Sequence, residues 1–383
     1  MRLNGAAVLF LCLVLGACAG PGAHDILTDA ARAGEFRTER LQRVYIATTR
    51  QPAQRAAEVF GPARSQMLSF AYADVSVPPG REIGARARPR SGRPDPRIHL
   101  IATEVGIYRD APGFAEAVRA DLKRSGGRAM VFVHGYNNHF DESVYRVAQL
   151  AEDAGFTGTA VLFGWASAGR VLDYVYDNNS ATAAREELEE TMRVLARNGA
   201  SRIDLVAHSM GTWIAMEALR QLAISGDADL GGKLGDVVLA SPDIDIDVFK
   251  SQMLRIGKPK QRYYVVVSGD DKALRLSSFI AGANPRVGEY ADARDLADYG
   301  VIVVNVSAFK AGDRLNHAKF ATHPLLVRLL GTQLNDPDAF QGSSTDISEA
   351  IGLLARGLGR AVGSAAELVV TAPGTVVKVA VGG

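Results

Sequence analysis

Short apolar segments alternate regularly with amphipathic ones from Ala129 onward, and this alternation constrains the fold more than any other feature. The apolar segments have the length and β-branched content of buried strands, and they read MVFVH, AVLFGW, IDLVAHS, DVVLAS, YYVVVS and VIVVNVS. Helical periodicity separates them over residues 141–154, 181–197, 210–224, 248–254 and 324–330. Buried strands that alternate with helices form a mostly parallel sheet with helices on both faces. The sequence therefore predicts an α/β fold.

One of these strands ends abruptly in the segment Ala207-His208-Ser209-Met210-Gly211, after which the apolar period becomes helical. This pattern predicts a strand, a sharp turn and a helix. Small residues two positions before and after Ser209 allow the strand and the helix to approach closely, and the serine hydroxyl is then exposed at the edge of the sheet. We expect Ser209 to be a nucleophile. The alternative is a small turn residue that caps the helix.

Several further motifs resemble α/β-hydrolases in their order and spacing: VFVHGYN, FGWASAG followed by DYVYD, LVAHSMG, ASPDID and SGDDKAL. The segment around Ser209 is similar to the Gly-x-Ser-x-Gly nucleophile elbow of that family, with Ala207 in place of the first glycine. The resemblance spans residues 41–330, and it points to a bacterial group whose members are often exported and whose activity is largely unassigned. It implies the α/β-hydrolase fold but supplies no substrate.

The resemblance also implies an oxyanion hole. The segment His134-Gly135-Tyr136 looks like the His-Gly-x loop of α/β-hydrolases, in which the backbone amide after the glycine binds the oxyanion. The expected donors are therefore the backbone N–H groups of Tyr136 and Met210. His134 itself is expected to brace the loop through hydrogen bonds, and a role as base is the alternative.

In this family the nucleophile, the acid and the base follow one another in that order along the chain. Five of the seven histidines precede the nucleophile, namely His24, His99, His134, His139 and His208. Of the other two, His317 follows the last strand across a polar loop, where an imidazole can reach the serine, and it is the expected base. His323 precedes Pro324 at an expected helix start, so a cap or surface role is expected for it and the base role is the alternative.

The expected acid is Asp271. It follows the strand YYVVVS, and the segment Ser268 to Asp271 resembles the Gly-x-x-Asp turn that carries the acid in this family. A carboxylate there fixes the tautomer of the imidazole and stabilises its cation. Asp270 is a candidate turn residue or helix cap. Asp243 and Asp245 occupy the alternative acid position that some members use.

The first residues predict an exported and lipid-anchored protein. Arg2 precedes the apolar run AAVLFLCLVLGA, which is too short to span a bilayer comfortably, and Leu15-Gly16-Ala17-Cys18 follows. This is similar to a bacterial lipoprotein signal, which implies cleavage before Cys18 and acylation of that cysteine. The expected location is the periplasmic face of a membrane of the bacterial cell envelope, with the outer membrane preferred. A plain secretory signal or an uncleaved anchor is the alternative.

These assignments divide the chain into a signal peptide (residues 1–17), a tether (18–40), a hydrolase domain (41–335) and a C-terminal tail (336–383). The tail contains an apolar stripe at helical spacing, formed by Ile347, Ile351, Leu354, Leu358 and Val362. Such a helix is suited to a membrane surface, to docking on its own domain or on a neighbour, and a disordered end is the remaining alternative.

The charge balance argues against a nucleic-acid partner, because a net charge of +1 supplies no field that would gather a polyanion. The two cysteines, Cys12 and Cys18, both lie in the leader, so no disulfide is expected in the mature chain. The sequence contains no His/Cys cluster with metal-ligand spacing and no glycine-rich phosphate loop, and no cofactor or metal is expected. The composition does not predict the oligomeric state.

Together these features predict a membrane-anchored serine hydrolase that cleaves a carboxylic ester of a small molecule or a lipid. An acyl-enzyme on Ser209 is the expected intermediate. The alternatives are an acyltransferase with the same residues, or a hydrolase-fold scaffold or binding protein of the envelope without turnover.

Overall fold

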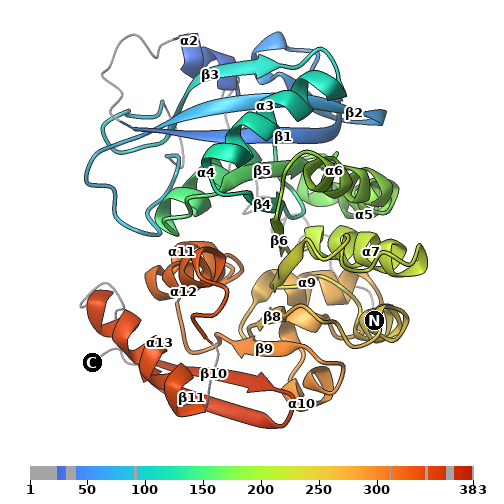
Figure 1. The fold of residues 1–383 in the computed structure, drawn as a ribbon, viewed down its shortest axis with the longest axis vertical. Helices are drawn as coiled ribbons and strands as arrows, with labels where there is room; N and C mark the ends of the chain where they lie inside the picture. The colour runs from blue at the N-terminus through green and yellow to red at the C-terminus, as the bar shows by residue number, and fades with distance from the viewer. Residues whose placement is uncertain are drawn as a thin grey trace, which may run out of the picture.

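The computed structural model describes residues 24–31, 40–89, 93–310, 312–340, 344–358 and 366–381. Within these residues eleven strands form one sheet (Figure 1). From one edge to the other they are β11 (Thr375–Val381), β10 (Ala366–Ala372), β9 (Ile302–Asn305), β8 (Tyr263–Val267), β7 (Leu234–Ala240), β6 (Arg202–His208), β4 (Arg128–Val133), β5 (Thr159–Gly164), β1 (Arg40–Pro52), β2 (Phe60–Val77) and β3 (Ile101–Ile107).

The centre of the sheet is parallel and both of its ends are antiparallel. The strands from β1 across β5, β4, β6, β7 and β8 to β9 pair in parallel. At the ends, β2 and β3 and also β10 and β11 add as antiparallel strands. The predicted mostly parallel sheet is therefore confirmed.

Helices cover both faces of the sheet (Figure 1). One face carries α3 (Ala111–Arg124), α5 (Tyr174–Ala183), α6 (Arg185–Arg197), α7 (Gly211–Ile224) and α8 (Ile246–Ile256). The other face carries α2 (Ile26–Ala31), α4 (Phe140–Asp153), α11 (Lys319–Thr322), α12 (Pro324–Asn335) and α13 (Ser344–Leu358). The helix expected over residues 181–197 belongs to two helices, because α5 ends at Ala183 and α6 begins at Arg185.

The central strands are mostly apolar because both of their faces are buried. In β4, Val131 and Val133 pack in the core beneath α3, α6 and α7, whereas Met130 and Phe132 pack in the core beneath α4. Successive side chains of a strand point to opposite faces, so a strand buried on both faces holds few polar residues. The buried aspartates of β6 and β7, Asp204 and Asp236, form ion pairs with Arg202.

The part of the expected tether that the structure describes is folded onto the domain. Residues 26–31 form α2, and Ile26 is buried against the sheet. The carboxylate of Asp29 accepts a hydrogen bond of 2.6 Å from the hydroxyl of Tyr145 in α4. This helix is only six residues long, which is too short for its periodicity to be recognised in the sequence.

The C-terminal region belongs to the same sheet. Strands β10 and β11 form a hairpin that pairs with β9, and the sequence analysis did not predict it. Helix α13 packs on α12 and β11 through Ile351 and Ala355, so it docks on its own domain. On the other side of the helix Leu353 is 62% exposed. Val362, the last residue of the expected stripe, lies outside the described residues.

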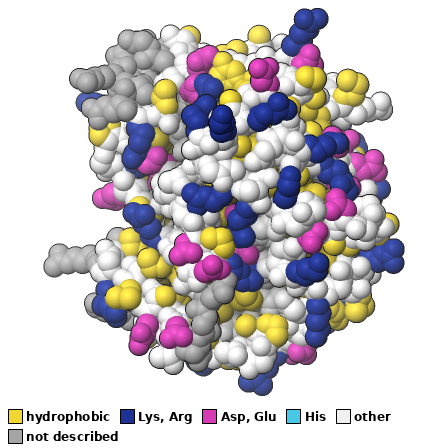
Figure 2. Space-filling view, viewed as in Figure 1, with side chains coloured by type: hydrophobic (Ala, Val, Ile, Leu, Met, Phe, Trp, Pro, Cys, Tyr) yellow, Lys and Arg dark blue, Asp and Glu magenta, His cyan; other side chains and the backbone are white. Residues whose placement is uncertain are grey.

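Charged side chains of both signs are interspersed on the face shown in Figure 2, as the net charge of +1 leads one to expect. The expected signal peptide and Cys18 lie outside the described residues. Among the described helices none is long and apolar enough to cross a bilayer.

Candidate active site

Loops at one edge of the sheet bring the three expected triad residues into one region. Ser209 follows β6, Asp271 follows β8 and His317 follows β9, and these strands lie within four neighbouring positions of the sheet. The carboxyl ends of parallel strands meet at the same edge, which is where α/β folds place their ligands. The site is therefore built from loops that follow neighbouring parallel strands of the sheet.

Ser209 occupies a strained turn between β6 and α7. Its φ is 53°, a left-handed conformation that costs a non-glycine residue about 1–3 kcal/mol. Its backbone N–H donates to Ala240 O at 3.0 Å and its carbonyl accepts from the Thr212 backbone N–H at 3.0 Å, so both neighbouring elements hold the turn. The side chain lies at the start of α7, where the helix dipole is positive.

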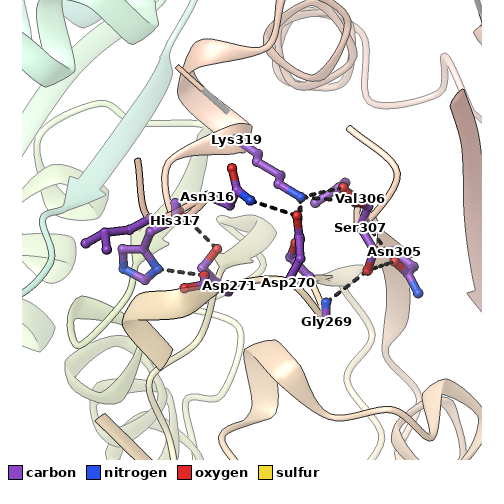
Figure 3. A network of polar contacts seen from close by, with 12 residues as sticks. Gly269, Asp270, Asp271, Asn305, Val306, Ser307, Asn316, His317 and Lys319 are labelled. Carbon is purple, nitrogen blue, oxygen red and sulfur yellow. Dashed lines mark hydrogen bonds and ion pairs between the residues drawn. The ribbon is translucent and has the colours of Figure 1, made fainter. Parts of the chain in front are cut away.

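Asp271 holds the imidazole of His317. Its Oδ2 lies 2.7 Å from Nδ1 of His317, as Figure 3 shows. Its other oxygen, Oδ1, accepts the backbone N–H groups of Ala273 and Leu274 at 3.0 and 3.1 Å and so caps helix α9 (Lys272–Ile280). The carboxylate is fully buried and fixed by the helix, which leaves one oxygen to orient the ring.

His317 lies beside the serine turn. Its ring centroid is 4.6 Å from that of His208, the residue before Ser209. Its carbonyl oxygen accepts a hydrogen bond of 3.2 Å from the hydroxyl of Ser241, which follows β7. The sequence analysis placed His208 within the turn, and the structure shows that its ring packs between His317 and Phe320.

Opposing effects act on the pKa of His317. Burial lowers it, whereas the hydrogen bond to Asp271 and the negative charges of Asp271, Asp243 and Asp313 raise it, and the net effect is a pKa above the ordinary value of 6.5. The pKa of His208 falls well below its ordinary value, because its ring is buried and lies next to His317. Of these two rings, only that of His317 has a pKa high enough to act as a base.

The loop after β4 packs directly against the serine turn. A Cβ atom added to Gly135 would lie 2.9 Å from Cβ of Ser209, and one added to Gly211 would lie 2.4 Å from the carbonyl oxygen of His134. These two glycines permit the close approach. No acceptor among the described residues takes the backbone N–H of Tyr136 or of Met210, the two expected oxyanion donors.

His134 braces this loop from below. One ring nitrogen contacts the carbonyl oxygen of Gly135 at 2.9 Å and the other that of Trp165 at 3.1 Å, and the indole N–H of Trp165 donates to His134 O at 2.7 Å. The two rings are stacked, and burial lowers the pKa of His134 to about 3. Burial therefore favours the neutral ring, in which one nitrogen donates to its carbonyl oxygen and the other carries no hydrogen, and Trp165 packs beneath the loop.

Arg50 supports the same loop, and the sequence analysis missed it. Its guanidinium is buried and donates to three carbonyl oxygens, those of Gly61 at 3.1 Å, Ser167 at 3.0 Å and Asn138 at 2.7 Å. Burial lowers its pKa to about 10. An arginine at the end of a β-strand carries no sequence signal for such a role.

A second polar network joins the loops of Asp271 and His317 (Figure 3). Asp270 accepts from Nζ of Lys319 at 2.5 Å through Oδ1 and from the side-chain amide of Asn316 at 2.9 Å through Oδ2. Lys319 is buried and also donates to Ser268 Oγ at 2.9 Å. Asp270 thus connects the acid loop to the residues on either side of His317.

The alternative carboxylates have other partners. Asp243 is buried and accepts from Ser277 Oγ at 2.5 Å and from the Tyr174 hydroxyl at 3.3 Å, and Arg286 Nε lies 3.3 Å away. Asp245 caps α8 by accepting the backbone N–H groups of Asp247 and Val248. His323 is the residue before α12, and it is buried with its ring packed edge-to-face on Phe309, so the expected surface role is wrong.

Backbone strain is concentrated around this site. Seven described non-glycine residues have positive φ, and four of them lie in its loops, namely Asn137, Ser209, Ser241 and Asn316. Such strain persists only where the surroundings hold it, and it gathers at functional sites. Among the described residues no group of three His, Cys, Asp or Glu side chains is arranged to hold a metal ion.

Three solved esterase structures illustrate how far the structural similarity reaches. An esterase from Pyrobaculum calidifontis is 10% identical, with 88% of this chain and 99% of that chain covered and a TM-score of 0.37. One from Rhizomucor miehei is 10% identical, with coverages of 82% and 89% and a TM-score of 0.37. A thermophilic carboxylesterase from a metagenomic library is 11% identical, with coverages of 81% and 93% and a TM-score of 0.34. At these values none of their activities is transferred to this chain.

No curated protein matches the sequence. The family model of an α/β hydrolase of unknown function, DUF900, matches residues 112–333. The matched region is more than half of the chain, and it includes the serine turn, the loop after β4 and the loops of Asp271 and His317. The chain therefore belongs to the DUF900 family of α/β hydrolases.

Proposed function

We propose that the protein is a serine hydrolase that cleaves carboxylic esters through an acyl-enzyme on Ser209. The observation that carries the proposal is the arrangement at the edge of the sheet. A buried carboxylate, fixed as a helix cap, contacts Nδ1 of His317 at 2.7 Å, and the ring of His317 lies against the residue before a strained serine. A nucleophile, a base and an orienting acid are the parts that acyl transfer needs.

In the proposed reaction His317 takes the proton of the Ser209 hydroxyl, and the serine oxygen bonds to the carbonyl carbon of the ester. The backbone amides of Tyr136 and Met210 donate to the oxyanion. The protonated His317 then gives its proton to the leaving alkoxide as the ester bond breaks. Water attacks the acyl-enzyme with His317 again as base, and the carboxylic acid and free Ser209 result.

Apolar side chains near the site favour an ester with an apolar acyl or alkyl group. Leu172 and Val175 are exposed on either side of Tyr174, whose hydroxyl contacts Ser277 Oγ of α9 at 2.8 Å. In the same helix Phe279 is 80% exposed. Both segments contact or adjoin residues of the site, and their exposed apolar side chains support an apolar substrate.

The first test is intact-mass analysis of the full chain after exposure to a fluorophosphonate, which reacts with activated serines. One adduct is expected on the unaltered chain and none on Ser209→Ala or His317→Ala. Ser180→Ala is the matched control, because Ser180 is a buried serine that bonds within α5. Absence of an adduct on the folded unaltered chain would favour the non-catalytic scaffold.

Substrate class is measured with aryl esters of increasing acyl length, and added alcohols separate hydrolysis from acyl transfer. Hydrolysis gives only the free acid. A new ester in the products would show that the enzyme is an acyltransferase.

We also propose that Cys18 carries the lipid that anchors the protein to the bacterial envelope. The supporting feature is the sequence Leu15-Gly16-Ala17-Cys18 after an apolar run. Each buried methylene of an acyl chain contributes about 0.8 kcal/mol, so several chains anchor stably. Cells grown with an alkyne fatty acid should label the unaltered chain and not Cys18→Ser. Equal labelling of both would place the lipid elsewhere.

A further inference from the structure

A cavity of about 390 Å³ lies between the sheet and the helices α12 and α13, apart from the proposed triad. Its floor is formed by Val238, Val266, Val304 and Val370, which belong to the neighbouring strands β7, β8, β9 and β10. Adjacent strands are about 4.8 Å apart, so the cavity runs for roughly 14 Å across the strands. Its volume is within the range of small-molecule sites, roughly 300–1,000 Å³, and its outline is elongated.

The walls of the cavity are almost entirely apolar. Apart from Gln333, Thr375 and the hydroxyl of Tyr264, every lining residue is aliphatic or is a phenylalanine. Water does not occupy an apolar cavity favourably, because it finds too few hydrogen-bond partners there. The natural occupant of such a space is a hydrocarbon chain.

Gln333 is held by protein partners. The residue is 4% exposed, and its Nε2 donates to Asp236 Oδ2 at 2.6 Å and to Pro337 O at 3.1 Å. Both amide hydrogens are therefore used, which fixes the orientation of the group. Its Oε1 is enclosed by protein atoms, so an occupant of the cavity does not reach it.

We propose that this cavity binds a fatty acid through its alkyl chain, which lies between the sheet and α13. The almost entirely apolar lining and the length of roughly 14 Å across the strands suit a hydrocarbon chain. The site uses neither Ser209 nor His317, so it is separate from the proposed esterase activity. Two residues connect the regions: Phe320 lines the cavity and its ring lies 4.8 Å from that of His208, and Val306 lines the cavity and its carbonyl oxygen accepts from Lys319 Nζ at 3.2 Å.

The test is photolabelling of the full chain with a fatty acid that carries a diazirine in its alkyl chain. The chain carries Ser209→Ala so that ester competitors stay intact. Labelled peptides are expected from α12, α13 and strands β8 to β10. In this background Ile351→Trp, which fills the cavity, should lower the labelling about tenfold. The matched control is Leu353→Trp, because Leu353 is exposed on the same helix, and its labelling should be unchanged.

Val370→Phe is a second variant that fills the cavity, from the opposite wall. It keeps the proposal testable if Ile351→Trp does not fold. Circular dichroism and thermal unfolding identify which variants are folded. Labelling that persists in both folded variants would overturn the proposal. So would labelling confined to the exposed side of α13 around Leu353, which would instead place that helix on a membrane surface.

Competition then tests the occupant. Lauric acid should displace the probe, because its alkyl chain fills the same apolar space. Failure of lauric acid to displace the probe would contradict the proposal, and stronger displacement by monolauroylglycerol would identify a monoacyl lipid as the occupant instead.

Discussion

Nζ of Lys319 lies 2.5 Å from Oδ1 of Asp270, and this contact ties the loop of His317 to the loop of Asp271. Lys319 follows His317 by two residues, and Asp270 directly precedes Asp271. The ion pair is therefore in a position to set the distance between the imidazole and the carboxylate that orients it. Its second support, Asn316, holds the other side of the same loop.

Lys319→Met should lower kcat/KM about 10- to 100-fold, because a displacement of the base by about 1 Å is enough for such a loss. KM should change little, since no part of the proposed oxyanion loop is altered. Steady-state kinetics on an aryl ester measure both constants. Lys378→Met is the matched control, because Lys378 is exposed and its ion pair with Glu367 is long at 3.8 Å. Equal losses in the two variants would show that the Lys319 contact has no positioning role.

Asp271→Asn should lower kcat about 10⁴-fold and leave the fold stable. The asparagine still caps α9 through its side-chain oxygen, but it no longer stabilises the imidazolium of His317. Kinetics and thermal unfolding of the same preparation test both parts. In Asp243→Asn the loss should be less than about tenfold, because the Asp243 carboxylate interacts with Ser277, Tyr174 and Arg286 and acts on His317 only through its charge. A larger loss in Asp243→Asn than in Asp271→Asn would reverse the assignment of the acid.

The pH dependence should show a base with a pKa above 6.5. His317 accepts the serine proton only when it is neutral, and its pKa is raised, so kcat/KM should fall as the pH falls through that raised value. In Asp243→Asn the acidic limb should move to lower pH, since the charge of Asp243 helps to raise the pKa of His317. A pH–rate profile from pH about 4 to 9 measures the shift. An unchanged limb in this variant would contradict the proposed electrostatic contact.

The raised pKa of His317 also affects the stability of the folded state. This effect is largest at low pH, whereas the activity is lowest there. The folded state binds the His317 proton more tightly than the unfolded state, so this contribution is fully present below pH about 6.5 and is lost as the pH rises through the folded-state pKa. Chemical denaturation of His317→Gln and of the unaltered chain at several pH values measures it. The difference in free energy of unfolding should shrink as the pH rises.

Three glycines should respond differently to replacement by alanine. At Gly211 the new Cβ would lie 2.4 Å from a backbone oxygen, so the free energy of unfolding should fall by several kcal/mol. Gly135→Ala should lower activity more than stability, because its Cβ would lie 2.9 Å from Cβ of Ser209 and thus displace the proposed nucleophile. Gly357→Ala in α13 meets no atom within 4 Å and should stabilise the protein by about 0.5–1 kcal/mol. Denaturant unfolding together with ester hydrolysis distinguishes the three outcomes.

The sequence predicted the fold class because its buried parallel strands are continuous apolar runs, which are recognised without any tertiary information. It also predicted which residues meet at the carboxyl edge, since Ser209, Asp271 and His317 each follow such a run. Their catalytic roles stay predictions until the experiments above are done. The resemblance to a known family narrowed the choice among seven histidines, which periodicity alone cannot do.

Other elements had weaker signals. The hairpin of β10 and β11 was missed, although its alternating valines on either side of Pro373-Gly374 are a recognisable turn pattern. The roles of Arg50 and Lys319 were not predictable, because each depends on carbonyl or carboxylate groups that are distant in the sequence. Side chains that hold loops in place follow no helix or strand periodicity in the sequence.

Because the backbone of Ser209 is left-handed, the proposed nucleophile lowers the stability of the folded protein. Glycine adopts a φ of 53° without strain, so Ser209→Gly should unfold at a higher temperature than the unaltered protein while losing its reactivity. Selection for thermal tolerance alone would therefore favour an inactive protein. Under the proposed mechanism, the serine at this position provides reactivity and gives up that gain in thermal stability.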